Sequence, residues 1–92
     1  MTNLEIKNRI RTFIEEQFLI EFDEDLPESS NLFLEGVLDS FGYVELCNFL
    51  ESEFEIKFSE KEMTANVLVS LTQMEAAVAD KLKSFQVGME SR

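Results

Sequence analysis

A chain of 92 residues, 45% of them hydrophobic, is long enough for one small folded domain and too short for two. The net charge is −11 and histidine is absent, which argues against a nucleic-acid partner, a zinc site and histidine-based catalysis. The single cysteine, Cys47, cannot form an internal disulfide, and the N-terminus has no uninterrupted apolar run. We therefore expect a cytoplasmic protein without a signal peptide or a membrane-inserted segment.

The first predicted element is an amphipathic helix over residues 3–18. Isoleucines and a phenylalanine recur there every three or four residues: Ile6, Ile10, Phe13 and Ile14. Asn3 is the predicted N-cap of this helix.

A long loop is predicted over residues 20–39, where the only proline, two serines, an asparagine and a glycine occur. Its acidic run FDEDLPESSN lacks the glycine that a calcium loop needs at its sixth position, and Pro27 interrupts the alternation of ligands. No metal site is expected. The apolar residues of the loop are expected to hold it on the core, namely Leu32, Phe33, Leu34, Val37 and Leu38.

A second helix is predicted over residues 40–53. One stripe of this helix is apolar and forms the predicted core face: Tyr43, Leu46, Cys47, Leu50 and Phe54. The other side carries a mixture of aromatic, acidic and polar residues: Phe41, Glu45 and Asn48, flanked by Val44, Phe49 and Glu51. An exposed phenylalanine beside glutamates is not what core packing requires.

Two capping boxes predict the remaining helices. Ser59-x-x-Glu62 starts a short helix near residue 59, and Ser70-x-x-Gln73 starts the last one. The buried face of the last helix is predicted to consist of Leu71, Met74, Val78 and Leu82.

The stretch 54–58 is expected to be an extended connection between helices. Gly88 is expected to follow the last helix, and residues 86–92 are expected to form a frayed tail outside a core of residues 4–85. The predicted fold is therefore all-α, a single domain (1–92) built as a small four-helix bundle. Three of its helices are long, one is short, and a long loop follows the first.

The motif Asp39-Ser40 stands at the start of the second helix. Both residue types are strong N-caps, so a purely structural role is one interpretation. The other is that Ser40 carries a phosphate group, because the N-terminus of a helix favours negative charge and Gly36 allows a sharp turn before it.

Acidic charge is concentrated around this motif. Residues 23–39 contain six acidic residues and no basic one, and residues 40–62 contain six acidic and two basic residues. Ten of the eleven net negative charges thus lie between residues 23 and 62. Such a field steers a basic protein surface, although acidic charge also serves solubility alone.

These residues resemble the acyl and peptidyl carrier protein family, whose signature is a glycine, Asp-Ser with a bulky apolar residue, and a helix with a Glu-Leu pair. Here it reads Gly36, Asp39, Ser40, Phe41, Glu45 and Leu46. The resemblance continues through LESEFEIKFSEKEM and SLTQMEAAV and covers roughly residues 4–82. The motif LDSFG…VEL is most similar to D-alanyl carrier proteins of teichoic-acid modification and to discrete carriers of polyketide and peptide pathways. Fatty-acid carriers usually have an acidic residue where Gly42 stands, which favours a specialised role.

The resemblance implies that Ser40 is the attachment point of 4′-phosphopantetheine, whose thiol holds a cargo as a thioester. It implies no catalysis by the chain itself. A phosphopantetheinyl transferase would add the arm with help from Asp39 and a metal ion of its own. An acyl- or aminoacyl-activating enzyme would load the cargo, and a downstream acyltransferase or synthase would receive it. The docking face would comprise Phe41, Glu45, Asn48 and Glu51.

The same features allow an alternative, an acidic helical adaptor that binds a basic partner protein and is never modified. In that case Ser40 is only a helix cap. An enzyme is disfavoured, because Cys47 lies on the buried stripe and has no histidine beside it. A stand-alone monomer is expected, and the identity of the cargo stays open.

Overall fold

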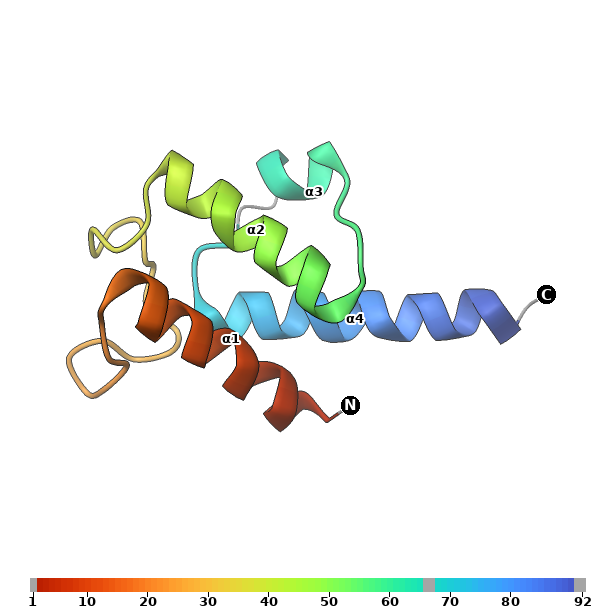
Figure 1. Ribbon diagram of the computed structural model, residues 1–92, viewed down its shortest axis with the longest axis horizontal. Helices are drawn as coiled ribbons and strands as arrows, with labels where there is room; N and C mark the ends of the chain where they lie inside the picture. Colours follow the sequence, from red (N-terminus) through yellow and green to blue (C-terminus); the bar gives the residue numbers. More distant parts are fainter. Residues whose placement is uncertain (1, 66–67, 91–92) are drawn as a thin grey trace.

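The computed structural model describes the backbone of residues 2–65 and 68–90 and the side chains of residues 2–64 and 68–83. Within them the chain forms four helices: α1 (Asn3–Phe18), α2 (Ser40–Phe54), α3 (Glu60–Ala65) and α4 (Leu71–Glu90). No strand occurs in this part of the chain, so the expectation of a small all-α bundle is confirmed. Figure 1 shows the long loop between α1 and α2 at one end and the last turns of α4 extending beyond the other.

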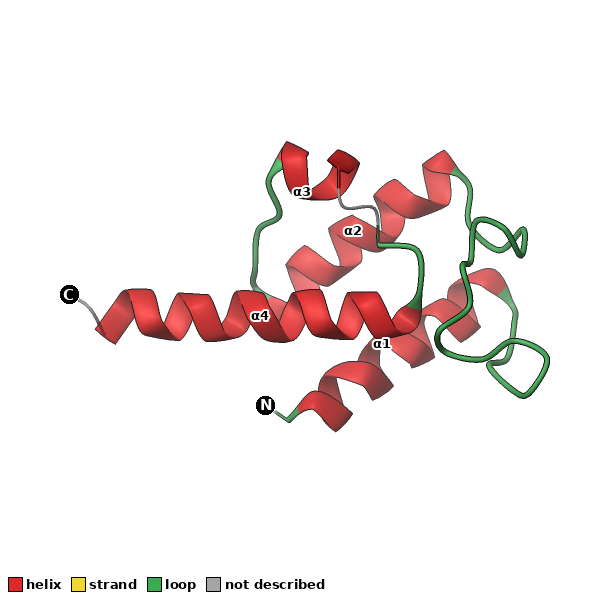
Figure 2. Cartoon of the chain, turned by 180° about the vertical axis from the view of Figure 1, so that it is seen from behind, coloured by secondary structure: helices red, strands yellow, loops and turns green. Residues whose placement is uncertain are grey.

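The core lies where α1, α2 and α4 meet, and α4 packs chiefly along α1. Figure 2 shows α4 in front of α1 and α2 when the chain is seen from behind. The predicted apolar faces supply this core. Its largest fully buried side chains are Ile6, Ile10, Ile14, Leu32, Leu46, Cys47, Leu50, Leu71, Met74 and Val78. Each large aliphatic side chain stabilises the fold by about 1.5–3 kcal/mol through removal from water.

The ends of α1 differ in one respect from the prediction. Thr2 is the N-cap, since its side-chain oxygen accepts a hydrogen bond of 3.2 Å from the N–H of Glu5, and Asn3 is the first helical residue. The assignment of Asn3 as the cap is therefore wrong by one position. Both residue types can cap, and sequence alone does not fix a helix boundary so closely.

Arg11 holds the acidic loop against α1. Its guanidinium donates to the carboxylates of Glu15 (3.3 Å) and Glu28 (3.2 Å) and to the carbonyl of Phe22 (3.1 Å). Lys7 forms a second ion pair with Glu28 at 3.3 Å. These contacts fix the first half of the loop, which is too polar to be held by apolar burial alone.

The second half of the loop is fixed to the start of α4. The N–H of Leu32 donates to the carbonyl of Val69 at 2.8 Å, and Leu32 itself is fully buried. Leu38 is buried as predicted, and Phe33 and Val37 are partly buried. Leu34 was expected in the core, yet its side chain is 83% exposed.

The two predicted capping boxes are present, with one difference in detail. Ser59 and Glu62 exchange both hydrogen bonds, at 2.8 and 3.1 Å. Ser70 caps α4 by accepting from the N–H of Gln73 at 3.2 Å, while the Gln73 side chain reaches the N–H of Val69 at 2.9 Å instead of that of Ser70. The expected extended connection 54–58 differs at its start, because Phe54 still belongs to α2 and Glu55 ends that helix in the left-handed conformation (φ +53°). Residues 56–59 then lead to α3 without helix or strand.

The last helix is longer than predicted, because α4 runs through Gly88 to Glu90. The predicted tail 86–92 is therefore helical as far as Glu90, and its last two residues, 91 and 92, lie outside the described residues. None of the helices in the described part of the chain has a stretch long and apolar enough to cross a bilayer.

Candidate functional site

Asp39 and Ser40 have different positions at the start of α2. Asp39 is the N-cap, with extended backbone angles, and its Oδ1 accepts a hydrogen bond of 2.7 Å from the N–H of Gly42. Ser40 is the first helical residue and is exposed, and among the described residues its Oγ makes no hydrogen bond. Asp39 thus caps α2 without help from the Ser40 hydroxyl.

The preceding turn places this pair at the surface. Asn31 Oδ1 accepts from the N–H groups of Phe33 (3.0 Å) and Leu34 (3.1 Å), and the N–H of Leu38 donates back to the carbonyl of Leu32 at 3.1 Å. Gly36 has a φ of +79°, which a residue with a side chain rarely adopts. The sharp turn expected at this glycine is therefore confirmed.

A shallow groove of about 510 Å³ lies beside Ser40. It lies between the start of α2, the loop and the α3 region, and its lining residues are Phe33, Ser40, Tyr43, Val44, Met63, Thr64 and Val69. Most of these side chains are apolar, so the groove provides a weakly polar surface next to an exposed hydroxyl.

The hydroxyl of Tyr43 closes the inner side of this groove. It donates to the carbonyl of Met63 and accepts from the N–H of Leu68, both at 3.1 Å. The Tyr43 ring also lies against that of Phe33, with centroids 5.5 Å apart and planes tilted by 55°. Burial raises the pKa of the phenol, so the hydroxyl is protonated at neutral pH and can donate. The sequence placed Tyr43 on the core face but gave no sign of these partners.

The four predicted docking residues of α2 differ in accessibility. Phe41 is 73% exposed and Asn48 is exposed. Glu45 is half-buried, and its carboxylate accepts from the side-chain amide of Gln17 at 3.3 Å. Glu51 is half-buried as well, and its carboxylate accepts a 2.8 Å hydrogen bond from the N–H of Phe58. Glu51 therefore already holds the connection that leads to α3.

Two more exposed apolar side chains lie close to Ser40 in the sequence, Leu34 and Val44, which are 83% and 50% exposed. Phe41, which is also exposed, lies between them in the sequence. The prediction missed Leu34, because a loop has no periodicity from which to infer which side chains point inward. Phe49, predicted on the flank, instead stacks on Phe13 of α1 at 3.8 Å between centroids.

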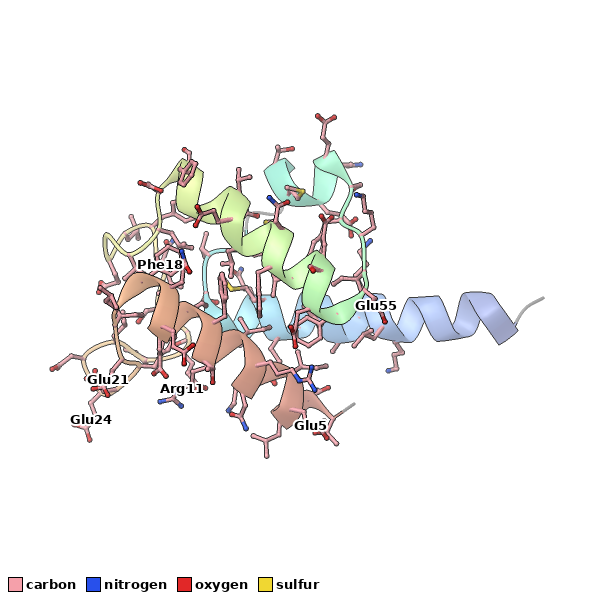
Figure 3. The ribbon with its side chains drawn as sticks, in the orientation of Figure 1. Glu5, Arg11, Phe18, Glu21, Glu24 and Glu55 are labelled. Atoms are coloured by element: carbon pink, nitrogen blue, oxygen red, sulfur yellow. The ribbon has the colours of Figure 1, made fainter. Side chains whose placement is uncertain are left out.

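Gly42 allows α1 to approach α2 closely. A Cβ at this position would lie 3.0 Å from Cε1 of Phe18, tighter than ordinary contact, and 3.3 Å from the capping oxygen of Asp39. Figure 3 labels Phe18 at the loop end of α1, and Glu21 and Glu24 on the outer side of the loop, away from the helices. Packing against Phe18 thus gives a structural reason for glycine directly after Phe41.

Cys47 is fully buried on the core face of α2. Burial raises the pKa of its thiol, which keeps it in the unreactive protonated form at neutral pH. The prediction that Cys47 lies in the core is confirmed.

Comparisons with known proteins bear on this arrangement. The D-alanyl carrier protein of Streptococcus suis (strain 05ZYH33) is 40% identical to this chain over 73 residues, which cover 73% of the chain and 90% of the relative. No family model matches the chain, and no solved structure matches it. Identity at this level over nearly the whole of a carrier protein shows the family. The chain belongs to the acyl and peptidyl carrier proteins.

Proposed function

We propose that Ser40 carries 4′-phosphopantetheine and that the chain presents a D-alanyl or another small aminoacyl group to partner enzymes. The observation that carries this proposal is the division between Asp39 and Ser40. Asp39 caps α2 through its 2.7 Å hydrogen bond to Gly42, and the Ser40 hydroxyl is left exposed at the helix start. Capping therefore does not explain why residue 40 is a serine.

The residues around Ser40 fit a phosphopantetheine group. The first N–H groups of a helix have no acceptor within the helix, and the helix dipole favours a phosphate at this end. The groove beside Ser40 is lined mainly by apolar side chains, which suits the uncharged part of the arm. When bound, the group supplies a long flexible arm whose terminal thiol holds the cargo as a thioester.

The residues of this chain have simple tasks in such a carrier. Ser40 supplies the oxygen to which a phosphopantetheinyl transferase attaches the arm. Asp39 caps the helix with Oδ1, and its second carboxylate oxygen is in no hydrogen bond or ion pair among the described residues, so it is available to the transferase. The family consists of carriers, and the chain holds its cargo while other proteins perform the chemistry.

The name of the S. suis relative supports D-alanine as the cargo. An enzyme that activates an amino acid or acyl group would load the arm, and a downstream acyltransferase or synthase would remove the cargo. Phe41, Glu45 and Asn48 would contact these partners, because they share the accessible face of α2 next to Ser40. Glu51 would contribute less, since its carboxylate is bonded to Phe58.

The alternative, an adaptor that is never modified, requires Ser40 to be a helix cap and nothing more. The capping geometry of Asp39 disfavours it. Both hypotheses include an acidic protein surface that binds basic partners, so only the modification distinguishes them.

The test is incubation of the protein with coenzyme A and a broad-specificity phosphopantetheinyl transferase, followed by intact-protein mass spectrometry. The wild type should gain one phosphopantetheine and the Ser40→Ala variant none. Ser59→Ala removes another serine at a helix start and should be modified like the wild type. An unmodified wild type, or modification that survives Ser40→Ala, would favour the adaptor.

Thiol labelling of the native protein gives a second measurement. Before modification no thiol should react with an alkylating reagent at neutral pH, because Cys47 is fully buried and its pKa is raised. After modification one thiol should react, and the label should be lost when the phosphodiester is cleaved. The modified protein should then accept D-alanine from a D-alanine-activating enzyme with ATP. If a different acid is loaded instead, D-alanine is not the cargo, and the proposed role as a carrier is retained.

A further inference from the structure

We propose that the hydrogen bonds of the Tyr43 hydroxyl restrict this carrier to small cargo by holding α3 closed against α2. We call the bonds to Met63 and Leu68 the Tyr43 clamp. The inference rests on the proposed function, since it concerns a group attached through Ser40. It makes Tyr43 a specificity-determining residue that acts chiefly by positioning α3.

The clamp joins elements that are far apart in the sequence. Tyr43 lies one turn into α2, Met63 lies in α3, and Leu68 lies in the connection that leads to α4. Both partners of the hydroxyl are backbone groups, so their position does not depend on side-chain rotation. Separation of α3 from α2 would break both of these part-buried hydrogen bonds, which is unfavourable.

The core faces of α2 and α4 are closed to solvent. Five of their residues are fully buried: Leu46, Cys47, Leu50, Leu71 and Met74. Protein cores are packed to the density of organic crystals, so a chain of several methylene groups enters only if helices move apart. The clamp opposes this movement at the place where Ser40 would present the cargo.

The groove outside the clamp is where a small group has room. It starts at Ser40 and extends to Met63 and Val69, and Phe33 and Tyr43 form its wall with rings 5.5 Å apart. A short aminoacyl group on the arm can remain in this groove without any change of the helices. A long acyl chain could bury little of its surface there, because the groove is shallow.

A second contact holds the other side of α3. Lys81 of α4 donates to the carboxylate of Glu62 at 2.7 Å, and this hydrogen bond lowers the pKa of Glu62. The pair is partly exposed, so it contributes less than a buried contact would. The Tyr43 clamp is therefore the contact on which closure next to Ser40 chiefly depends.

The experiment compares two cargo lengths. A broad-specificity transferase transfers acetyl- or octanoyl-4′-phosphopantetheine from the corresponding acyl coenzyme A to the Ser40 oxygen and releases adenosine 3′,5′-bisphosphate. Mass spectrometry verifies each product before thermal melting. In the wild type we expect acetyl and octanoyl forms to melt at the same temperature. In Tyr43→Phe the octanoyl form should melt higher than the acetyl form by at least about 4–8 °C, roughly the shift for burial of a single methylene group in a domain of this size.

The control variant is Ile14→Val, which weakens the core on α1 without touching the clamp. Ile14→Val should lower the melting temperatures of the acetyl and octanoyl forms equally. Tyr43→Phe would do the same if Tyr43 only stabilised the fold. An octanoyl wild type that melts several degrees above the acetyl form overturns the inference, and so does a Tyr43→Phe variant without dependence on chain length.

If Tyr43→Phe does not fold, the thioester hydrolysis rate of the wild type decides. Equal rates for acetyl and octanoyl thioesters support the inference, and severalfold protection of the octanoyl form overturns it. Absence of any acyl-phosphopantetheine in the mass spectrum is a separate result that contradicts the proposed function itself.

Discussion

At the scale of the residue, two neighbours at the start of α2 have different roles: one caps the helix and the other exposes its hydroxyl. The sequence alone could not assign these roles. Asp39 and Ser40 are adjacent, and both are good N-caps, so either could have stabilised the helix. In the structure Asp39 is the N-cap, because its Oδ1 accepts from the N–H of Gly42, and Ser40 is the first helical residue. A capping carboxylate next to a free hydroxyl keeps the helix start ordered whatever is attached to the serine.

This division predicts unequal costs for two neighbouring substitutions. Asp39→Ala should lower the free energy of unfolding by about 0.5–2 kcal/mol, because the N–H of Gly42 loses its partner. Ser40→Ala should lower it by less than about 1 kcal/mol, since Ser40 makes no capping bond. Urea unfolding monitored by circular dichroism measures both.

A matched variant separates capping from charge at the same position. Asp39→Asn retains a side-chain oxygen that can cap, so its stability should stay close to that of the wild type. If Asp39 also assists the transferase, the rate of modification should nevertheless fall in Asp39→Asn. Should Ser40→Ala prove more destabilising than Asp39→Ala, the assignment of the cap would be reversed.

At the scale of the element, local patterns predicted the fold well. Helical periodicity identified the core stripe of α2, and all five of its residues are buried: Tyr43, Leu46, Cys47, Leu50 and Phe54. The capping boxes located α3 and α4 because their partners are only three residues apart. These features depend on short stretches of sequence, where geometry is nearly fixed by the helix itself.

Contacts between distant residues were not predictable in the same way. The three hydrogen bonds of Arg11, the Tyr43 clamp and the bond from Phe58 to Glu51 all require knowledge of how the elements pack. For the same reason the sequence showed that Gly42 departs from the fatty-acid carriers but not that Phe18 lies against it. Of the candidate site, the sequence predicted Asp39, Ser40 and the exposed Phe41, whereas the groove and its wall became visible only in the structure.

The orientation of α2 can be tested by two substitutions on opposite faces. Leu50 is fully buried, so Leu50→Ala should cost about 2–5 kcal/mol of unfolding free energy through lost burial and a new cavity. Asn48 is exposed, and Asn48→Ala should change it by no more than about 0.5 kcal/mol. Thermal melts of the two variants give this comparison, and similar losses in both would mean that α2 is rotated relative to its described position.

At the scale of the whole molecule, ion pairs divide the acidic residues into two groups. Basic residues of α1 and α4 neutralise part of the charge in five ion pairs, which involve Glu15, Glu28, Glu53 and Glu62. Glu35, Asp39 and Glu45, which lie near Ser40 in the sequence, form none with the described residues. These three carboxylates are therefore available to a partner close in sequence to the proposed attachment point, as are the exposed apolar side chains of Leu34, Phe41 and Val44. A partner with a basic rim around an apolar contact would match this surface.

This arrangement predicts different salt dependence for two residues of the same face. Glu45→Lys should lower kcat/KM of the transferase and of the loading enzyme at low salt, and the effect should shrink as salt rises. Exposed charges are screened beyond about 8 Å at physiological ionic strength, and charges at the rim of an interface act mainly on the association rate. Phe41→Ala removes an apolar contact, so it should lower kcat/KM by a similar factor at every salt concentration.

Two controls make the result specific. Glu45→Gln removes the charge but retains an oxygen for the 3.3 Å hydrogen bond from Gln17, so it should show about half the electrostatic effect without loss of packing. Asp80→Lys makes the same change of charge at an exposed position on α4 and should leave both enzymes nearly unaffected. If Glu45→Lys and Asp80→Lys reduce the rates equally, net charge alone steers the partners. If neither reduces them at low salt, the acidic surface serves solubility, and recognition depends on the apolar residues around Ser40.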